Sequence, residues 1–273
     1  MGLDASVMCN CHRLGKATSC PFPDDFYVDE DGFPAIRLKE DEVDKSDEFD
    51  EWLATCCAHP YMDYVTVHIP SWKGYRSLVE ALEAIGSEQF PTLIAELPEA
   101  NEGVTTATAS ALALKELIVF QSMDDISRTF LVNTETGTVI SSTTAGDDRL
   151  LSVDAHTGLR PGFDTNGFYI SDTWELNREL FRAKRVEQRR IESKELDVPD
   201  EYEFTDLDSG QKFVSTTPLR IFVRGEAGLK QGYPARIHVE KRVVDASYFK
   251  SIIEPLKTVF EASVEMDNPV RWG

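Results

Sequence analysis

Residues 128–143 read Arg-Thr-Phe-Leu-Val-Asn-Thr-Glu-Thr-Gly-Thr-Val-Ile-Ser-Ser-Thr. Two runs rich in β-branched and apolar residues, Arg128–Val132 and Thr138–Thr143, flank the dipeptide Thr136-Gly137. This arrangement is typical of a β-hairpin, because glycine readily adopts the positive φ that many tight turns require. The stretch therefore predicts antiparallel β structure near the middle of the chain.

Working outward, we find both strand and helix patterns. Apolar residues recur at every second position in the expected strands and at i, i+3 and i+4 in the expected helices. They do not follow a regular βαβ alternation, so the sequence predicts an α+β fold with antiparallel sheets and hairpins packed against amphipathic helices. The expected strands are residues 3–11, 26–28, 64–69, 128–132, 138–143, 201–204, 212–215, 219–223 and 237–244; the expected helices are residues 46–56, 75–85, 108–120, 174–195 and 249–260.

The sequence predicts further features for three of the expected helices. Ser46 is expected to cap the first helix, and residues 108–120 are apolar on nearly all sides, which predicts a buried helix. Pro255 is expected to kink or split the last helix, which follows Asp245. Residues 154–167 are rich in Gly, Asp and Pro and are expected to form a long loop.

The charge is distributed unevenly between two halves of the chain. Of 273 residues, 41% are hydrophobic, which is ample for a packed core. Residues 1–125 carry 8 bases and 24 acids, net −16, whereas residues 126–273 carry 20 bases and 24 acids, net −4. We therefore expect an acidic α+β lobe over 1–125 and a second α+β lobe over 126–273 with the hairpins and a long C-terminal helix. A single continuous domain is the alternative.

The segment Asp24–Glu51 is the most acidic part of the chain. It holds thirteen carboxylates and three bases, a net −10 in 28 residues. Such a field repels nucleic acid and anionic membranes and attracts basic proteins. Aromatic and apolar residues are interleaved with the acids, which predicts an ordered surface instead of a disordered tail; an ordinary solvated face is the alternative. The candidate partner-binding residues are Asp24, Asp25, Phe26, Tyr27, Asp29, Glu30, Asp31, Glu40, Asp41, Glu42 and Asp44.

All five cysteines lie in the first 57 residues, and we expect reduced thiols. Cysteine and histidine are zinc ligands, and zinc takes four of them in a tetrahedron. The chain has no Cys-x-x-Cys pair, and Cys9, Cys11 and Cys56 fall on apolar faces, so the pattern favours core packing over a metal site. The candidate metal ligands are Cys9, Cys11, Cys20, Cys57 and His59.

No catalytic motif is present. The chain lacks the Gly-x-Ser-x-Gly elbow, the dinucleotide-binding glycine pattern and the Walker lysine loop. Asp154, His156 and Asp164 share one polar stretch, but a surface histidine in a loop is the commoner case. We therefore expect a non-enzymatic protein with no catalytic residues and no cofactor.

One basic cluster lies within residues 174–195, with glutamates between its members. An ion-paired surface is the preferred interpretation, and docking against the acidic segment is the alternative. The cluster consists of Arg178, Arg182, Lys184, Arg185, Arg189 and Arg190.

The chain shows neither a secretory signal nor an apolar run of roughly 18 residues, the length a membrane helix needs. We therefore expect a cytoplasmic protein that binds neither a membrane nor nucleic acid.

The opening Met-Gly-Leu-Asp-Ala-Ser-Val-Met-Cys-Asn-Cys resembles that of a group of uncharacterised bacterial proteins. The similarity extends to Val28–Gly32 and to Asn268–Trp272. By analogy, acidic α+β proteins of this kind resemble immunity proteins that neutralise toxins. The resemblance and the charge together suggest an inhibitor that covers the active site of a basic toxin such as a nuclease, with Phe26, Tyr27, Phe33 or Trp72 as anchors. Two alternatives are a zinc-binding or enzymatic protein built on the cysteine–histidine cluster and a DNA mimic.

Overall fold

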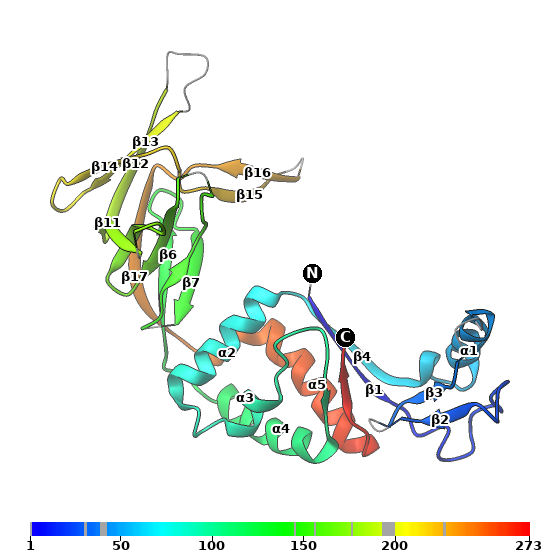
Figure 1. Cartoon of the computed structure of the whole chain (residues 1–273). Coiled ribbons are helices and arrows are strands. Elements are labelled where there is room, and N and C mark those ends of the chain that lie inside the picture. Colours follow the sequence, from blue (N-terminus) through cyan, green and yellow to red (C-terminus); the bar gives the residue numbers. More distant parts are fainter. Residues whose placement is uncertain are drawn as a thin grey trace. The chain divides into compact units, whose positions relative to one another are not determined.

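The computed structural model describes residues 2–29, 32–38, 43–144, 146–155, 157–175, 177–192, 200–225 and 228–273, and for residues 43–44, 221–225 and 228–231 it describes the backbone. Two compact units are present (Figure 1). Unit 1 comprises Met1–Asp124 and Asp245–Gly273, and unit 2 comprises Asp125–Val244. The α+β prediction is confirmed. The C-terminal helix, however, packs in the first unit and not in the second, so the chain leaves unit 1 and returns to it.

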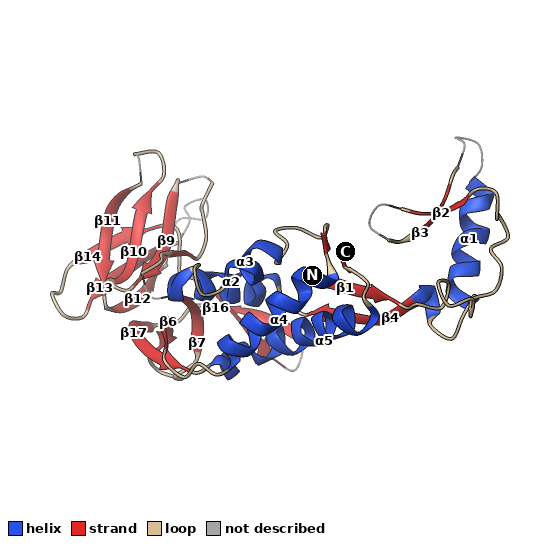
Figure 2. Ribbon diagram, turned by 90° about the horizontal axis from the view of Figure 1, so that it is seen from below, coloured by secondary structure: helices blue, strands red, loops and turns tan. Residues whose placement is uncertain are grey.

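Unit 1 is built around a four-stranded antiparallel sheet of order β4-β1-β18-β5. Helix α5 packs against β1 and β4, α4 packs against α5, and α3 packs against α4; Figure 2 shows α4 and α5 side by side. The elements are β1 (Leu3–Met8), β2 (Phe26–Val28), β3 (Pro34–Ile36), α1 (Val43–Thr55), η1 (Pro60–Met62), β4 (Asp63–Ile69), α2 (Trp72–Gly86), α3 (Pro91–Glu96), β5 (Val104–Thr105), α4 (Ala107–Gln121), η2 (Ala246–Phe249), α5 (Lys250–Met266) and β18 (Val270–Trp272).

The two ends of the chain lie side by side in this sheet. Strand β1 pairs with β18 in antiparallel register, with Ala5 opposite Trp272. The backbones of Asp4 and Gly273 exchange two hydrogen bonds, of 3.0 and 2.9 Å. The first and last segments of the chain therefore stabilise each other, which explains why α5 belongs to unit 1.

Two helices of unit 1 show how far local sequence signals, a capping residue and a proline, decide helix boundaries. Ser71 caps α2 by accepting a hydrogen bond from the Gly74 amide at 3.1 Å. Helix α5 continues unbroken through Pro255, so the predicted split is wrong. A proline removes one backbone donor, but burial of the face from Ile252 to Phe260 holds the helix together.

Three other expectations for unit 1 are corrected. Strand β1 ends at Met8, so Cys9 and Cys11 follow the strand and do not lie on it. Helix α1 begins at Val43, which places Ser46 inside the helix and not at its cap. Helix α4 is not buried on all sides, because Ile118 is 50% exposed while its neighbour Leu117 is fully buried.

Unit 2 is made of strands. A four-stranded sheet has the order β11-β10-β9-β8, and a six-stranded sheet has the order β14-β13-β12-β17-β6-β7. Buried residues of both sheets, among them Phe163, Phe181 and Phe204, form one hydrophobic core. The strands are β6 (Ile126–Asn133), β7 (Val139–Thr144), β8 (Arg149–Leu150), β9 (Leu159–Asp164), β10 (Gly167–Asp172), β11 (Arg178–Ala183), β12 (Arg185–Ile191), β13 (Glu201–Asp206), β14 (Lys212–Ser215), β15 (Ile221–Gly225), β16 (Gly228–Gly232) and β17 (Arg236–Val244).

Both predicted hairpins are confirmed, as β6–β7 and β13–β14. The helix expected over 174–195 is wrong: the chain forms β11 and β12 there, and the two strands belong to different sheets. Phe181 and Val186 are buried in the core, and this tertiary burial overrides the helix propensity of the charged residues. The expected loop over 154–167 contains β9, which pairs with both β8 and β10.

No helix in the described part of the chain is long and apolar enough to span a bilayer.

Candidate functional site

The acidic segment, residues 24–51, includes the β2–β3 hairpin and most of α1 in unit 1. Asp24 is exposed, and Asp25 forms an ion pair with Lys45 at 3.3 Å. Asp29 Oδ1 accepts a hydrogen bond from the Phe33 amide at 2.7 Å and so supports the hairpin turn. Asp44 lies in α1. The predicted residues Glu30, Asp31, Glu40, Asp41 and Glu42 lie outside the described residues.

Helix α1 has two opposite faces. Phe49, Trp52 and Cys56 are buried in a hydrophobic cluster. The other face exposes four carboxylates, and among the described residues none of them forms an ion pair. These four, Asp47, Glu48, Asp50 and Glu51, are called the α1 acidic face below. Because the apolar face of α1 is buried in this cluster, the carboxylates lie on an ordered helix, as the interleaved aromatic residues predict.

Of the predicted anchors, only Tyr27 is clearly exposed, at 38%, and the Arg37 guanidinium lies over its ring at 5.5 Å. Phe33 is buried and cannot serve as an anchor. Phe26 is half-buried. Its ring centre lies 4.8 Å from that of His12 in a tilted arrangement and 5.9 Å from that of Trp52 in an edge-to-face arrangement, so it belongs to the core of this region. Trp72 is half-buried in α2.

The structure brings three of the candidate metal ligands together. One sulfur atom each from Cys9, Cys11 and Cys57 lies within 4.8 Å of the other two. The Cys9 and Cys57 Sγ atoms are 3.7 Å apart. Cys57 Sγ also contacts the backbone of His59, and Cys20 Sγ accepts from the Phe22 amide at 3.4 Å. We name Cys9, Cys11 and Cys57 the thiol triad.

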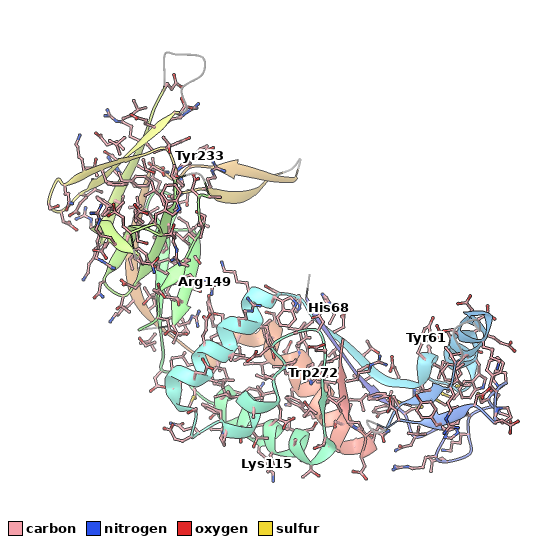
Figure 3. All side chains as sticks on the ribbon, in the orientation of Figure 1. Tyr61, His68, Lys115, Arg149, Tyr233 and Trp272 are labelled. Atoms are coloured by element: carbon pink, nitrogen blue, oxygen red, sulfur yellow. The ribbon has the colours of Figure 1, made fainter. Side chains whose placement is uncertain are left out.

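A turn with unusual backbone angles lies next to the triad. Tyr61 and Met62, in the turn that follows Cys57 and His59, both have positive φ, of 56° and 59°. Tyr61 projects from this turn and is 60% exposed (Figure 3). Met62 is fully buried, and its carbonyl accepts a hydrogen bond from the Cys9 amide at 2.7 Å. The turn therefore connects the two segments that carry the thiols.

Burial governs the protonation of the thiols in this core. Burial raises the pKa of Cys9 to about 12 and that of Cys56 to about 11. A metal-free thiol of that kind stays neutral at physiological pH, whereas the reactive form of cysteine is the thiolate. Cys9 and Cys56 are therefore unsuited to nucleophilic catalysis.

A pocket of about 340 Å³ opens beside the triad. Asn10 donates to the Met266 carbonyl at 2.8 Å, and Asn268 donates to the Met8 carbonyl at 2.8 Å. The pocket is thus lined by residues from three segments, which lie at and after the end of β1, in and around the β2–β3 hairpin, and after α5; only Cys9 among its residues is a site candidate from the sequence. The lining residues are Met8, Cys9, Asn10, His12, Arg13, Val28, Gly32, Pro34 and Asn268.

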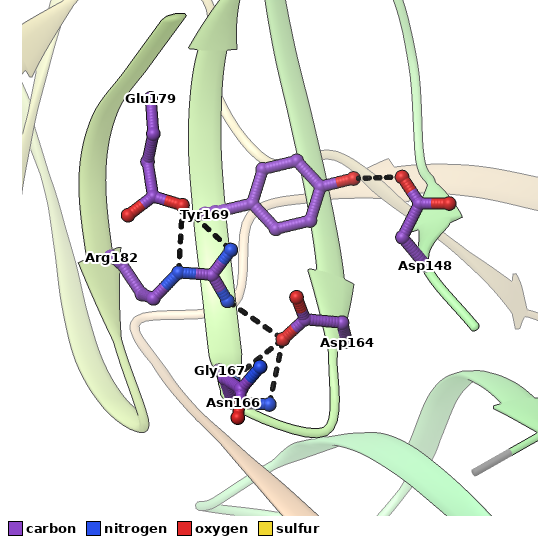
Figure 4. A network of polar contacts seen from close by, with 7 residues as sticks. All are labelled: Asp148, Asp164, Asn166, Gly167, Tyr169, Glu179 and Arg182. Carbon is purple, nitrogen blue, oxygen red and sulfur yellow. Dashed lines mark hydrogen bonds and ion pairs between the residues drawn. The ribbon is translucent and has the colours of Figure 1, made fainter. Parts of the chain in front are cut away.

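A second, polar pocket of about 250 Å³ lies in unit 2, on the sheet formed by β8 to β11. Figure 4 shows the network of polar contacts at this place. Arg182 forms ion pairs with Asp164 at 2.7 Å and Glu179 at 2.6 Å, and its guanidinium lies 5.1 Å from the Tyr169 ring centre. Tyr169 donates to Asp148 at 2.9 Å. These charged and polar groups pair with one another, so the network stabilises the sheet.

The remaining candidates in unit 2 have structural roles. Asp154 accepts a hydrogen bond from the Thr217 hydroxyl at 2.6 Å, whereas Asp164 pairs with Arg182. His156 lies outside the described residues. Five members of the basic cluster lie on β11 and β12, and Lys184 lies between these strands. The five arginines pair with carboxylates of the same unit; they are Arg178, Arg182, Arg185, Arg189 and Arg190. The expected ion-paired surface is therefore present, on strands.

Comparison with known proteins identifies no relative: no family model, curated protein or solved structure matches the chain.

Proposed function

We propose that unit 1 binds a basic protein partner through the α1 acidic face. The observation that carries the proposal is the arrangement of α1. Its four exposed carboxylates form no ion pair with any residue that the structure describes, and Phe49 and Trp52 bury the opposite face of the helix in a hydrophobic cluster. An ordered set of charges has a fixed geometry, so it can match a partner's cations and favour one orientation of approach.

Affinity would come from apolar contacts close to the charges. Tyr27, Val28 and Leu38 expose 38, 51 and 47% of their surface around the β2–β3 hairpin. Val28 also lines the 340 Å³ pocket beside the thiol triad, which is large enough to receive one side chain of a partner. Interfaces gain most of their binding energy from a few such desolvated anchors, whereas charges chiefly raise the association rate.

The partner that fits this chemistry best is a basic toxin, and the protein would act as its immunity-type inhibitor in the cytoplasm. A nuclease presents a phosphate-binding cleft lined by cations, and an acidic face can cover that cleft in place of the nucleic acid. Two features suggest this class of partner: the negative charge of the chain, and the resemblance of its first and last segments to a group of uncharacterised bacterial proteins. A DNA mimic would use the same carboxylates on a nucleic-acid-binding host protein.

The test compares two variants with equal change in net charge. The first, Asp47→Asn/Glu48→Gln/Asp50→Asn/Glu51→Gln, neutralises the α1 acidic face. The control neutralises four other exposed acids of unit 1, Glu88→Gln/Glu99→Gln/Glu102→Gln/Asp124→Asn. Partners are captured from the native host with the wild-type protein, purified, and assayed for association rate against all three proteins at several salt concentrations.

We expect the first variant to associate at least about tenfold more slowly at low salt, with the difference vanishing above about 0.5 M salt. The control variant should lose much less. Equal losses in both variants would show that net charge and not the α1 face governs binding, and would contradict the proposal. The partner's own activity then separates the two classes: a toxin inhibited by this protein supports the immunity role, whereas a host regulator of DNA supports mimicry.

A further inference from the structure

The thiol triad joins two parts of the chain that are far apart in sequence. Cys9 and Cys11 follow strand β1, and Cys57 follows helix α1, yet one sulfur of each lies within 4.8 Å of the others. Core packing of cysteine as a small apolar residue does not require three sulfurs to converge on one point. Convergence of this kind is what a shared ligand requires.

The distance between two of the sulfurs matches tetrahedral zinc. With Zn–S bonds of about 2.3 Å, two sulfurs of a tetrahedron lie about 3.8 Å apart. The observed distance between Cys9 Sγ and Cys57 Sγ is 3.7 Å. These two atoms therefore already stand at the separation that a common zinc ion would impose.

Hydrogen bonds outside the cluster hold the two segments in this position. The Thr18 amide donates to the Cys56 carbonyl at 2.8 Å, and the Trp52 indole donates to Thr18 Oγ1 at 3.2 Å. The Lys16 amide donates to the Cys11 carbonyl at 2.8 Å. These hydrogen bonds hold the loop from Cys11 to Thr18 against α1 and the residues that follow it, and so help to position the sulfurs, as metal sites require.

We propose that Cys9, Cys11 and Cys57 bind a zinc ion that links the end of β1 to the end of α1. The fourth ligand of the tetrahedron is Cys56 or His59: Cys56 directly precedes Cys57 in the sequence, and His59 follows two residues after it. Thiolates are soft ligands that select zinc over hard cations such as magnesium. Each thiol that coordinates zinc releases its proton to solvent, so binding weakens as the pH falls.

The test uses a matched pair of variants of the full chain. Cys11 and Cys20 are both half-buried in the same cluster, but only Cys11 belongs to the triad. Wild type, Cys11→Ser and Cys20→Ser are purified with a phosphine reductant, which competes little for zinc, and dialysed. Zinc is measured by elemental analysis, folding by circular dichroism, and Tm with and without a chelator.

We expect about one zinc per chain in wild type and Cys20→Ser, and close to none in folded Cys11→Ser. The chelator should lower the Tm of the first two proteins only. Metal-free wild type whose Tm responds neither to chelator nor to added zinc would overturn the proposal, as would equal loss of zinc from both variants.

Cobalt(II) keeps the proposal testable if Cys11→Ser does not fold. Titrated into metal-free wild type, cobalt should give the sulfur-to-metal charge-transfer bands and the intense visible bands of tetrahedral thiolate coordination; a spectrum of octahedral, hydrated cobalt would overturn the site. Loss of zinc from only one of Cys56→Ala and His59→Ala identifies the fourth ligand, and retention by both would overturn its assignment to these residues.

Discussion

Gly162 lies directly against the phenol of Tyr169, its partner across strands β9 and β10. A Cβ atom built on Gly162 would stand 2.5 Å from Tyr169 Oη and 2.9 Å from the Arg149 carbonyl. The glycine is therefore required by close packing inside the sheet, within a stretch that looks like a loop in the sequence but forms strand β9. It also positions Tyr169 to reach Asp148 and Arg182 (Figure 4).

The first prediction concerns this contact. Gly162→Ala should destabilise unit 2 by about 1–3 kcal/mol, because the methyl group can enter only if the ring or the strand moves. Urea unfolding measures the change. If the clash with the ring is the cause, Gly162→Ala should cost less in a Tyr169→Leu background; equal costs in both backgrounds would contradict the assignment.

The second prediction concerns Tyr169 itself. Its pKa is raised above its ordinary value, first by burial and then by the hydrogen bond to Asp148. A raised tyrosine pKa means that the neutral form stabilises the fold, fully below about pH 10 and progressively less as pH rises toward the folded pKa. Tyr169→Phe should lose about 1–2 kcal/mol at pH 7 through the missing hydrogen bond to a charged group. Its unfolding free energy should then fall less than that of wild type above about pH 10, and parallel pH profiles would contradict this.

The third prediction tests the two faces of α4. Leu117 is fully buried, whereas the adjacent Ile118 is 50% exposed. Leu117→Ala should destabilise unit 1 by about 2–5 kcal/mol, because it removes packed methyl groups and leaves a cavity. Ile118→Ala should change the free energy of unfolding by about 0.5 kcal/mol or less. Similar losses from the two variants, measured by chemical denaturation, would show that α4 is covered on both sides.

The fourth prediction concerns the β13–β14 hairpin. The Ser209 hydroxyl and the Asp208 amide donate hydrogen bonds to Asp206, and the Ser209 bond is the chief reason that the pKa of this carboxyl is lowered. A lowered carboxyl pKa means that the charged form stabilises the fold above about pH 4 and that this stabilisation is lost as pH falls through the folded pKa. Asp206→Asn should therefore be less stable than wild type at pH 7.

The difference between wild type and Asp206→Asn should shrink below about pH 4. Asp208→Asn is the matched control, because its ion pair with Arg185 at 3.0 Å is exposed to solvent and contributes little. A difference between wild type and Asp206→Asn that stays constant from pH 7 to about pH 2 would show that the charge of Asp206 does not stabilise the hairpin.

Local patterns in the sequence predicted the elements that depend on local rules. The two hairpins follow from glycine-containing turns between apolar runs, and α2 and α5 follow from apolar residues at helical spacing. The same reasoning failed over Arg178–Ile191, where helix-forming charged residues form strands because Phe181 and Val186 enter a core built from distant strands. The sequence pattern also predicted that Pro255 would kink or split the last helix, whereas α5 runs without a break from Lys250 to Met266.

The sequence by itself determined the α+β class, the uneven charge and the concentration of every cysteine in the first 57 residues, because these are properties of composition and short-range order. Only the tertiary structure decided that β1 pairs with β18, that the C-terminal helix belongs to unit 1, and that three thiols meet. Each of these contacts joins residues dozens to hundreds of positions apart. Such a contact forms only when burial of the whole core compensates the entropy lost in closing long loops, and no local pattern records that balance.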